Sequence, residues 1–356
     1  MTTRRTRSVI ASGRPLSTRI GLLIVAGLLT GCAVTGSAPA PRSVFRAVLI
    51  SDLNASYGST HYPAEVGNAI AHITDTWRPD VVLIAGDMVA GQSPQLPDSI
   101  VWAMWAAFDS VVAAPLRSAG IPLVATMGNH DASAYPAHAR DRRIAAEHWR
   151  ASPHRSQLPR LVHGDHYPLR YAVRYPDVFI VAWDATNQES TTSEELLNWL
   201  HGVLTSHEAR QARHRVVLAH LPLYGVAEGR DRPGEVLSHG DEVRRQIESW
   251  GATLFVSGHH HAYYPGRRDA LDLLHAGALG EGPRVLLGTG MAATKTVSIL
   301  DFHADSLSIT TYRMEGGTDV SEPVATESLP AIICSSRGWV MRRDVAAVDT
   351  SCAAPR

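Results

Sequence analysis

Five apolar runs in this sequence each end on side chains that bind metal ions in proteins. Each run has the composition of a β-strand, and a carboxylate, an amide or an imidazole follows it directly. The end residues are Asp52, Asp87, Asn129 with His130, His220, and His259 to His261. Oxygen and imidazole ligands without thiolate suit divalent ions such as Mn, Fe or Zn. The pattern therefore predicts a metal site built from five separate segments.

The elements around these residues must bring the five ends together. Parallel strands need long crossover connections, so we expect the five runs to lie side by side in one sheet, with helices between them and their polar ends along one carboxyl edge. Helical spacing of apolar residues predicts helices over 63–77, 99–119, 140–149 and 192–207. Further short strands are predicted over 170–174, 178–182, 271–275, 285–287, 296–302 and 306–313. This alternation favours an α/β fold of two mixed sheets with helices on their outer faces.

The order of the polar ends is more specific than any one of them, since each alone also occurs in ordinary turns. Together they resemble the calcineurin-like metallophosphoesterase family from about Val44 to Met314. The motifs are Asp52, Gly86-Asp87, Gly128-Asn129-His130-Asp131, His220-Leu221-Pro222 and Gly258-His259-His260-His261. The resemblance implies a four-layer α/β/β/α sandwich of two mixed sheets that holds two divalent metal ions, of Mn, Fe or Zn type.

The resemblance also implies a role for each residue. Asp87 would bridge the two ions, Asp52 and His261 would complete the first, and Asn129, His220 and His259 the second. A hydroxide shared by the ions would attack a phosphomono- or diester. His130 would stabilise the developing charge or protonate the leaving oxygen, and Asp131 would orient its ring. His260 lies between two expected ligands, so we expect it on the opposite, outer side of the backbone.

One position departs from the family pattern. The family has histidine two residues after the first aspartate, whereas this sequence has Asn54, whose amide oxygen is the weaker ligand. Several outcomes remain open for the first ion: looser binding, a harder ion, an extra water, or a ligand from Tyr57 or His61. Related purple acid phosphatases also lack this histidine, but they have a tyrosine where this sequence has Ala90.

The N-terminus is predicted to be an export signal. Basic residues precede a short apolar stretch over 20–29 that is too short for a mature membrane span. The following Leu29-Thr30-Gly31-Cys32 resembles the lipobox of bacterial lipoproteins, in which the cysteine becomes the lipid-modified N-terminus. The alternative is an ordinary secretory signal cut near residues 38–40. Either reading predicts an exported protein, and the first anchors it by lipid in the bacterial cell envelope, periplasmic or on the outer surface.

Removing Cys32 from the count leaves Cys334 and Cys352. An even pair in an oxidising compartment predicts a disulfide that closes a C-terminal loop; the alternative is two unrelated thiols. The predicted organisation is a signal peptide over 1–31, a linker over 32–42, a catalytic domain over 43–316 and an extension over 317–356.

The 356 residues carry a formal net charge of −1. The protein therefore lacks the positive electrostatic field that would attract nucleic acid, and we expect no nucleic-acid binding. The predicted partners are a small-molecule phosphoester and, through the lipid, a membrane. Two other functions remain open. The first is a hydrolase directed at nucleotides. The second is a non-catalytic or weakly active metal-binding envelope lipoprotein of the same fold, whose chemistry is weakened at Asn54.

Overall fold

The computed structural model describes residues 44–151, 153, 158, 160–185, 192–314, 322–346 and 352. The chain divides into residues 1–41 and residues 42–356, and the second unit contains all the described residues. The predicted signal peptide over 1–31, the linker over 32–42 and Cys32 lie outside the described residues.

The first sheet has five strands in the order β12-β11-β1-β2-β3. β1, β2 and β3 are parallel, and β11 and β12 join them in antiparallel fashion. The strands are β1 (Phe45–Ile50), β2 (Val81–Ile84), β3 (Leu123–Ala125), β11 (Thr296–Phe302) and β12 (Leu307–Arg313). Every residue of β2 is buried, which explains its unbroken VVLI sequence, because a strand covered on both faces needs apolar side chains on both.

The second sheet has nine strands in the order β13-β14-β9-β10-β8-β7-β6-β5-β4. Its centre is parallel, through β6, β7, β8 and β10, and its two sides are antiparallel. The strands are β4 (Leu161–Val162), β5 (Tyr171–Arg174), β6 (Val178–Ala182), β7 (His214–Leu218), β8 (Leu254–Ser257), β9 (Tyr264–Arg268), β10 (Leu271–His275), β13 (Ile332–Ser335) and β14 (Gly338–Arg342).

Helices cover the outer faces of both sheets. The helices of the described residues are α1 (Ala64–His72), α2 (Asp98–Phe108), α3 (Ala114–Ser118), α4 (Asn129–Ala132), α5 (Ala139–Ala151), α6 (Glu194–Leu204), α7 (His207–Arg210) and α8 (Gly240–Ser249). α1 continues into a π-helical turn over Ile73–Trp77, and a second such turn over Asp109–Ala113 joins α2 to α3. Short 3₁₀ turns span Pro136–His138 and Thr326–Ser328.

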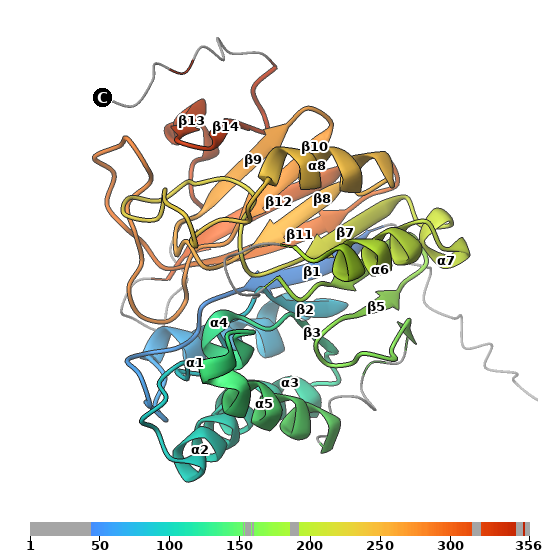
Figure 1. The fold of residues 1–356 in the computed structure, drawn as a ribbon. Coiled ribbons are helices and arrows are strands. Elements are labelled where there is room, and N and C mark those ends of the chain that lie inside the picture. The colour runs from blue at the N-terminus through green and yellow to red at the C-terminus, as the bar shows by residue number, and fades with distance from the viewer. Residues whose placement is uncertain are drawn as a thin grey trace, which may run out of the picture. The chain divides into compact units, whose positions relative to one another are not determined.

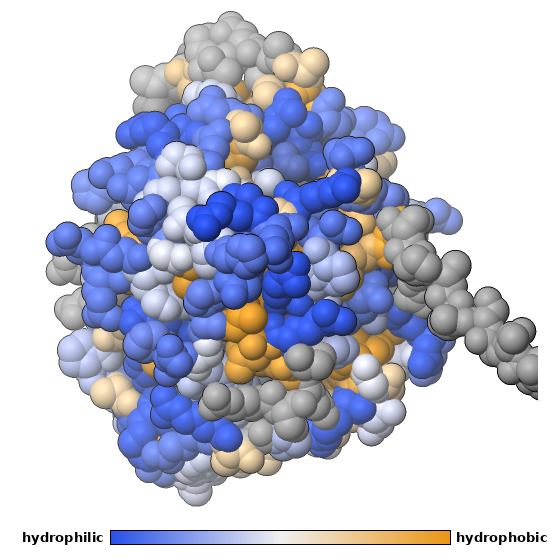
Figure 2. Space-filling view, turned by 90° about the vertical axis from the view of Figure 1, so that its right-hand side faces the viewer, coloured by the Kyte–Doolittle hydropathy of each residue, from blue (hydrophilic) through white to orange (hydrophobic). Residues whose placement is uncertain are grey.

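The layers follow from these positions. α1, α2, α3 and α5 lie on the side of the first sheet, and α6 and α8 lie on the side of the second (Figure 1). The face in Figure 2 is mainly hydrophilic and has smaller hydrophobic areas, as expected where the outer side of a covering helix meets water. The predicted architecture of two mixed sheets with helices outside them is confirmed.

Two expectations about the strands are wrong. The five ligand-bearing runs do not share one sheet, because β1, β2 and β3 belong to the first sheet and β7 and β8 to the second. The polar ends therefore meet where the carboxyl ends of two sheets approach each other. Residues 285–287 form no strand, and Leu286 makes only an isolated antiparallel bridge with Ala227.

The C-terminal segment adds a hairpin to the second sheet. β13 pairs with β14, and β14 pairs with β9 through Met341 and Arg267. A disulfide joins Cys334 of β13 to Cys352, 18 residues further along the chain. This is the pair that the cysteine count predicts.

Candidate metal centre

The candidate ligands come from five loops that follow strands. Asp52 and Asp87 lie just beyond β1 and β2, and Asn129 begins α4 after β3. His220 follows β7, and His259 and His261 follow β8. Each apolar strand anchors its loop in the core, so the polar residue after it is held at the sheet edge.

Four of these residues have a left-handed backbone conformation. The φ angles are 50° at Asp52, 53° at Asp87, 65° at His259 and 55° at His261. Residues other than glycine adopt this conformation at a cost in free energy, and strained residues of this kind tend to cluster at active sites. It turns the chain sharply as it leaves the strand and directs the side chain toward the neighbouring loops.

Two glycines allow the loops to approach one another closely. A Cβ atom at Gly128 would overlap the carboxylate of Asp87, and one at Gly258 would overlap the side chains of Ser51 and Asp52. The glycines that precede Asn129 and His259 therefore leave room for the carboxylates that project from the first sheet.

The ligand atoms form two groups that share one residue. Asp87, His220 and His259 offer atoms that all lie within 4.8 Å of one another, and so do Asp52, Asp87 and His261. Asn129 joins the first of these groups, because its Oδ1 lies 2.9 Å from Nε2 of His220. Asp87 thus belongs to both groups of candidate ligand atoms.

The histidine rings are fixed in the way that metal ligands require. A carbonyl oxygen only accepts hydrogen bonds, so the Nδ1 of His220 donates to Ala85 (2.7 Å) and the Nδ1 of His261 to Gly282 (2.8 Å). Their Nε2 atoms then face carboxylates, each at 3.3 Å, from Asp87 and Asp52 respectively. Fixing one ring nitrogen with an acceptor so that the other is free for a metal is the usual arrangement around metal-ligating histidines.

The electrostatics of the cluster favour a cation. Burial acts to raise the pKa of Asp87, but His220 and His130 lower it below its usual range. At Asp52 the opposing effects of burial and His261 likewise leave the pKa lowered. Burial disfavours the charged form of His220, yet Asp87 raises its pKa to about 9. The buried carboxylates thus demand positive charge, which a divalent ion supplies.

Asn54 has the environment of an oxygen ligand. It is buried, and its Oδ1 has no hydrogen-bond partner among the described residues. A buried acceptor without a partner is costly unless an unseen group satisfies it. The alternative ligands fit less well, since His61 is exposed and belongs to neither ligand group, and Tyr57 is 62% exposed.

The structure places Asp131 differently from the expectation that it orients His130. The carboxylate of Asp131 accepts hydrogen bonds from the backbone N–H groups of Met88, Val89 and Gly128 at 2.8 to 2.9 Å. It therefore fixes the loops after β2 and β3. Burial, and then the nearby Asp87, raise the pKa of Asp131 to about 7.

A carbonyl fixes the ring of His130 instead. Its Nδ1 lies 3.2 Å from the carbonyl oxygen of Gly91, and its Nε2 lies 4.0 Å from Oδ2 of Asp87. The ring of Tyr57 lies against it, with the two centroids 5.1 Å apart. His130 is thus at the edge of the ligand cluster, where Nε2 can reach a bound group.

His260 is not the surface residue that its place in the sequence suggested. It is fully buried, and its ring centroid lies 5.9 Å from that of His259. Its Nδ1 accepts from the backbone N–H of Val226 (3.2 Å), and its Nε2 donates to the backbone carbonyl of Glu235 (3.0 Å). With both ring nitrogens occupied, His260 attaches the loop after β7 to the site.

Sequence reasoning missed two residues that hold ligands in place. Glu235 accepts a hydrogen bond from Nε2 of His259 at 2.9 Å, and Gln92 accepts one from the side-chain amide of Asn129 at 2.7 Å. The second bond turns Oδ1 of Asn129 toward His220. Both residues lie in loops without periodicity or motif, so no signal in the sequence marks them.

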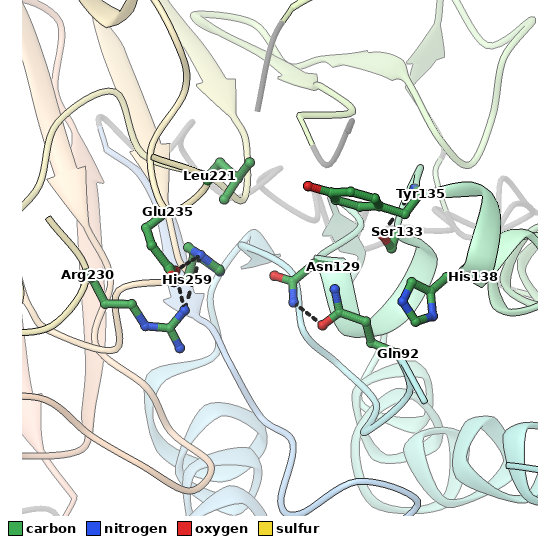
Figure 3. A pocket seen from close by; sticks show the side chains of 10 residues that line it. Gln92, Asn129, Ser133, Tyr135, His138, Leu221, Arg230, Glu235 and His259 are labelled. Atoms are coloured by element: carbon green, nitrogen blue, oxygen red, sulfur yellow. Dashed lines mark hydrogen bonds and ion pairs between the residues drawn. The ribbon is translucent and has the colours of Figure 1, made fainter. Parts of the chain in front are cut away.

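A cavity of about 370 Å³ opens beside this centre. Asn129 and His259 form part of its wall, and Arg230, Glu235, Gln92 and Tyr135 surround it (Figure 3). A molecule bound at the ligand cluster can thus extend into a defined space.

Comparison with known proteins agrees with this site. The sequence model of the family described as calcineurin-like phosphoesterase matches residues 45–263, more than half of the chain. No curated protein matches the sequence.

Solved structures with a similar chain path include GAP50 and Vps29, both at low sequence identity to this chain. GAP50, described as the anchor in the inner membrane complex of Plasmodium, is 11% identical with a TM-score of 0.48, over 79% of this chain and 87% of that chain. Vps29 of Entamoeba histolytica in complex with Zn²⁺ is 13% identical with a TM-score of 0.39, over 79% and 98%. Likeness at this level carries no information about activity.

Proposed function

The chain belongs to the calcineurin-like phosphoesterase family, and from this premise we propose that it is a metal-dependent hydrolase of phosphomono- or diesters. The observation that carries the proposal is the position of Asp87, which belongs to both groups of buried ligand atoms. A carboxylate shared in this way would help to hold a pair of ions.

The proposed first ion has Asp52, Asp87 and His261 as ligands, with the amide oxygen of Asn54 beside them. The proposed second ion has Asp87, Asn129, His220 and His259. Oxygen and imidazole donors without thiolate favour Mn, Fe or Zn. When bound, such a pair supplies a hydroxide at neutral pH and positive charge for the oxygens of the phosphoryl group.

His130 is proposed to act on the leaving group. Since Nδ1 donates to the carbonyl of Gly91, that nitrogen keeps its proton, and Nε2 is the atom that faces the centre. A second proton on Nε2 can pass to the leaving oxygen, or its N–H can stabilise the charge that develops there. Asp131 supports this arrangement by fixing the loop backbone that carries Asp87 and His130.

We also propose that the protein is exported and anchored to the bacterial envelope by a lipid on Cys32. The lipobox-like sequence over 29–32 supports this. The disulfide between Cys334 and Cys352 supports an oxidising compartment, since disulfides persist there and are rare in the cytosol.

The test is to measure the metal content of the purified protein together with hydrolysis of a panel of phosphomono- and diesters. We expect two divalent ions per chain and hydrolysis that a chelator abolishes. One ion per chain and no hydrolysis of any ester would instead indicate the metal-binding lipoprotein.

A further inference from the structure

Three arginine side chains gather beside the metal centre. Arg230 lines the cavity next to His259, a proposed ligand of the second ion, and its Nη1 lies 3.4 Å from Nε2 of that ring (Figure 3). Arg232 lies further out, with 68% of its side chain exposed. Arg284 comes from a different loop, and its backbone N–H donates to the carbonyl oxygen of His261 (3.0 Å), a proposed ligand of the first ion. These three residues are called the arginine cluster below.

Backbone pairing holds Arg284 beside the loop that carries Arg230. Ala227 and Leu286 form an isolated antiparallel bridge between the two segments. Further along the same segments, a Cβ atom at Gly229 would lie 3.8 Å from Nη1 of Arg284. The side chain of Arg284 therefore lies against the loop that ends in Arg230.

One carboxylate lies among the three guanidinium groups. Glu235 forms ion pairs with Arg230 and with Arg232, the latter at 2.9 Å. The same carboxylate accepts a hydrogen bond from Nε2 of His259 (2.9 Å). Because Glu235 can neutralise one of the three positive charges, two remain in the arginine cluster.

Two further carboxylates of the same loop have other partners. Asp231 accepts hydrogen bonds from the backbone N–H and the hydroxyl of Ser336 at 2.6 and 2.8 Å. Glu228 accepts one from the backbone N–H of Gly288 at 2.7 Å. Within the described ranges neither forms an ion pair with the arginine cluster, so Glu235 is the carboxylate that balances it.

Arg284 is held close to positive charge without an acceptor at its Nε. This atom is buried and has no hydrogen-bond partner among the described residues. Burial, and after it the neighbouring Arg230, lower the pKa of Arg284 below its usual range, and Glu235 opposes this effect. A partly buried guanidinium group in such surroundings is costly unless an anion pairs with it.

We propose that the arginine cluster binds a second phosphoryl group of the substrate, next to the one that is hydrolysed at the metal centre. A phosphomonoester carries a charge of about −1.5 to −2 at neutral pH, which matches the two unbalanced guanidinium groups. The planar guanidinium group can also pair with two phosphate oxygens at once. The inference rests on the proposed function and adds the substrate class, a bisphosphate of an alcohol compact enough for a cavity of about 370 Å³.

The experiment compares kcat/KM of the metal-loaded protein for glucose 1,6-bisphosphate and glucose 6-phosphate, which differ by one phosphoryl group. The wild-type protein should prefer the bisphosphate. In Arg284→Gln the ratio of the two values should fall about tenfold, the scale of one hydrogen bond to a charged group. Arg284→Lys keeps the positive charge and should retain part of the preference. Arg232→Gln changes an exposed side chain and should also lower the ratio.

Arg213→Gln is the matched control. Arg213 precedes β7, at the end of the strand opposite to His220, and its exposed guanidinium group pairs with Asp177 and Asp305. This variant should keep the wild-type ratio. A wild-type protein without preference for the bisphosphate, or an unchanged ratio in Arg284→Gln, would overturn this inference alone.

Thermal denaturation in the presence of a chelator tests the arginine cluster without turnover or metal. Inorganic phosphate should raise the midpoint relative to chloride at equal ionic strength, and the rise should be smaller in Arg284→Gln than in Arg213→Gln. Equal rises in the two variants would contradict the phosphoryl site. Failure to hydrolyse either ester would overturn the proposed function, and the phosphate measurement would still decide whether the arginine cluster binds a phosphoryl group.

Discussion

Oε2 of Glu235 lies 2.9 Å from Nε2 of His259, so a loop that follows β7 fixes the ring of a ligand that follows β8. Arg230 pairs with the same carboxylate, and Glu235 also accepts from His260 through its backbone carbonyl. Burial acts to raise the pKa of Glu235, but His259 and Arg230 lower it below its usual range. Glu235 therefore stays ionised, which favours the Nε2–H form of His259 and leaves Nδ1 for a metal.

Replacing Glu235 tests this relationship directly. Glu235→Ala should weaken binding of the second ion by about 10–100-fold, because partners of metal-ligating histidines have effects of this size. Glu235→Gln keeps an acceptor oxygen and should recover part of the loss. Calorimetric metal titration is the measurement. The control is Glu248→Ala, because the carboxylate of Glu248 pairs with Arg244 and not with a candidate ligand. This variant should bind metal as the wild type does.

The shared position of Asp87 predicts the most severe loss. Asp87→Asn should lower metal-dependent hydrolysis by more than about a hundredfold, since residues outside the ligand sphere already have effects of about 10–100-fold. Its metal content should also fall below two ions per chain. The control is Asp301→Asn. Asp301 lies on β11, and its carboxylate pairs with Arg46 of β1, so this variant should keep both ions. A near-normal rate in Asp87→Asn would contradict the bridging role.

Asn54 gives a test of the first ion alone. Asn54→His should tighten this ion, because imidazole is a stronger ligand than an amide oxygen. Asn54→Ala should loosen it. Metal titrations of the three proteins measure the difference, and identical curves would mean that the buried Oδ1 of Asn54 lies outside the ligand sphere.

Cys32 tests the predicted anchor, which lies outside the described residues. In a bacterial host, Cys32→Ser should release the protein from membrane fractions, because a cysteine-linked lipid can no longer form. Fractionation followed by detection of the protein measures this. Membrane association that survives the substitution would refute the lipid anchor.

Buried His275 on β10 predicts a loss of stability in acid. Burial lowers its pKa to about 3, compared with about 6.5 in an unfolded chain. The unfolded chain binds this proton first, so the free energy of unfolding declines as the pH falls from about 6.5 toward 3. Between pH 6.5 and pH 5 the contribution is about 2 kcal/mol.

Chemical denaturation at pH 6.5 and at pH 5, with a chelator present, measures the free energy of unfolding and hence the contribution of His275. His275→Leu removes the titrating group. Between pH 6.5 and pH 5, the free energy of unfolding of this variant should fall by about 2 kcal/mol less than that of the wild type. An equal fall in both proteins would show that His275 titrates normally in the folded state.

The sequence predicts the buried strands well, because their apolar runs reflect burial on both faces. The ranges 178–182, 271–275 and 296–302 coincide with β6, β10 and β11. β9 was missed because its sequence, YPGRR, contains proline, glycine and two arginines and has no alternation. α8 was missed because its sequence is strongly charged and its N-cap is His239 in a left-handed conformation.

The site was predictable to the extent that its ligands follow strands. A strand fixes where the next residue lies, so the order of Asp52, Asp87, Asn129, His220 and His259 carries spatial information. The sheet to which each strand belongs depends on long-range pairing, which is why the expectation of a single sheet failed. The partners Glu235 and Gln92 come from irregular loops, whose path depends on tertiary contacts such as those of His260.

The left-handed backbone at Asp52, Asp87, His259 and His261 sets function against folding. Glycine at any of these four positions would relieve the strain and would also delete a ligand. Optimising the stability of the folded chain alone would therefore favour glycine at these positions, and the ligand side chains would be lost. Aspartate and histidine at these four positions therefore keep the candidate ligand atoms in place at a cost in backbone strain that glycine would avoid.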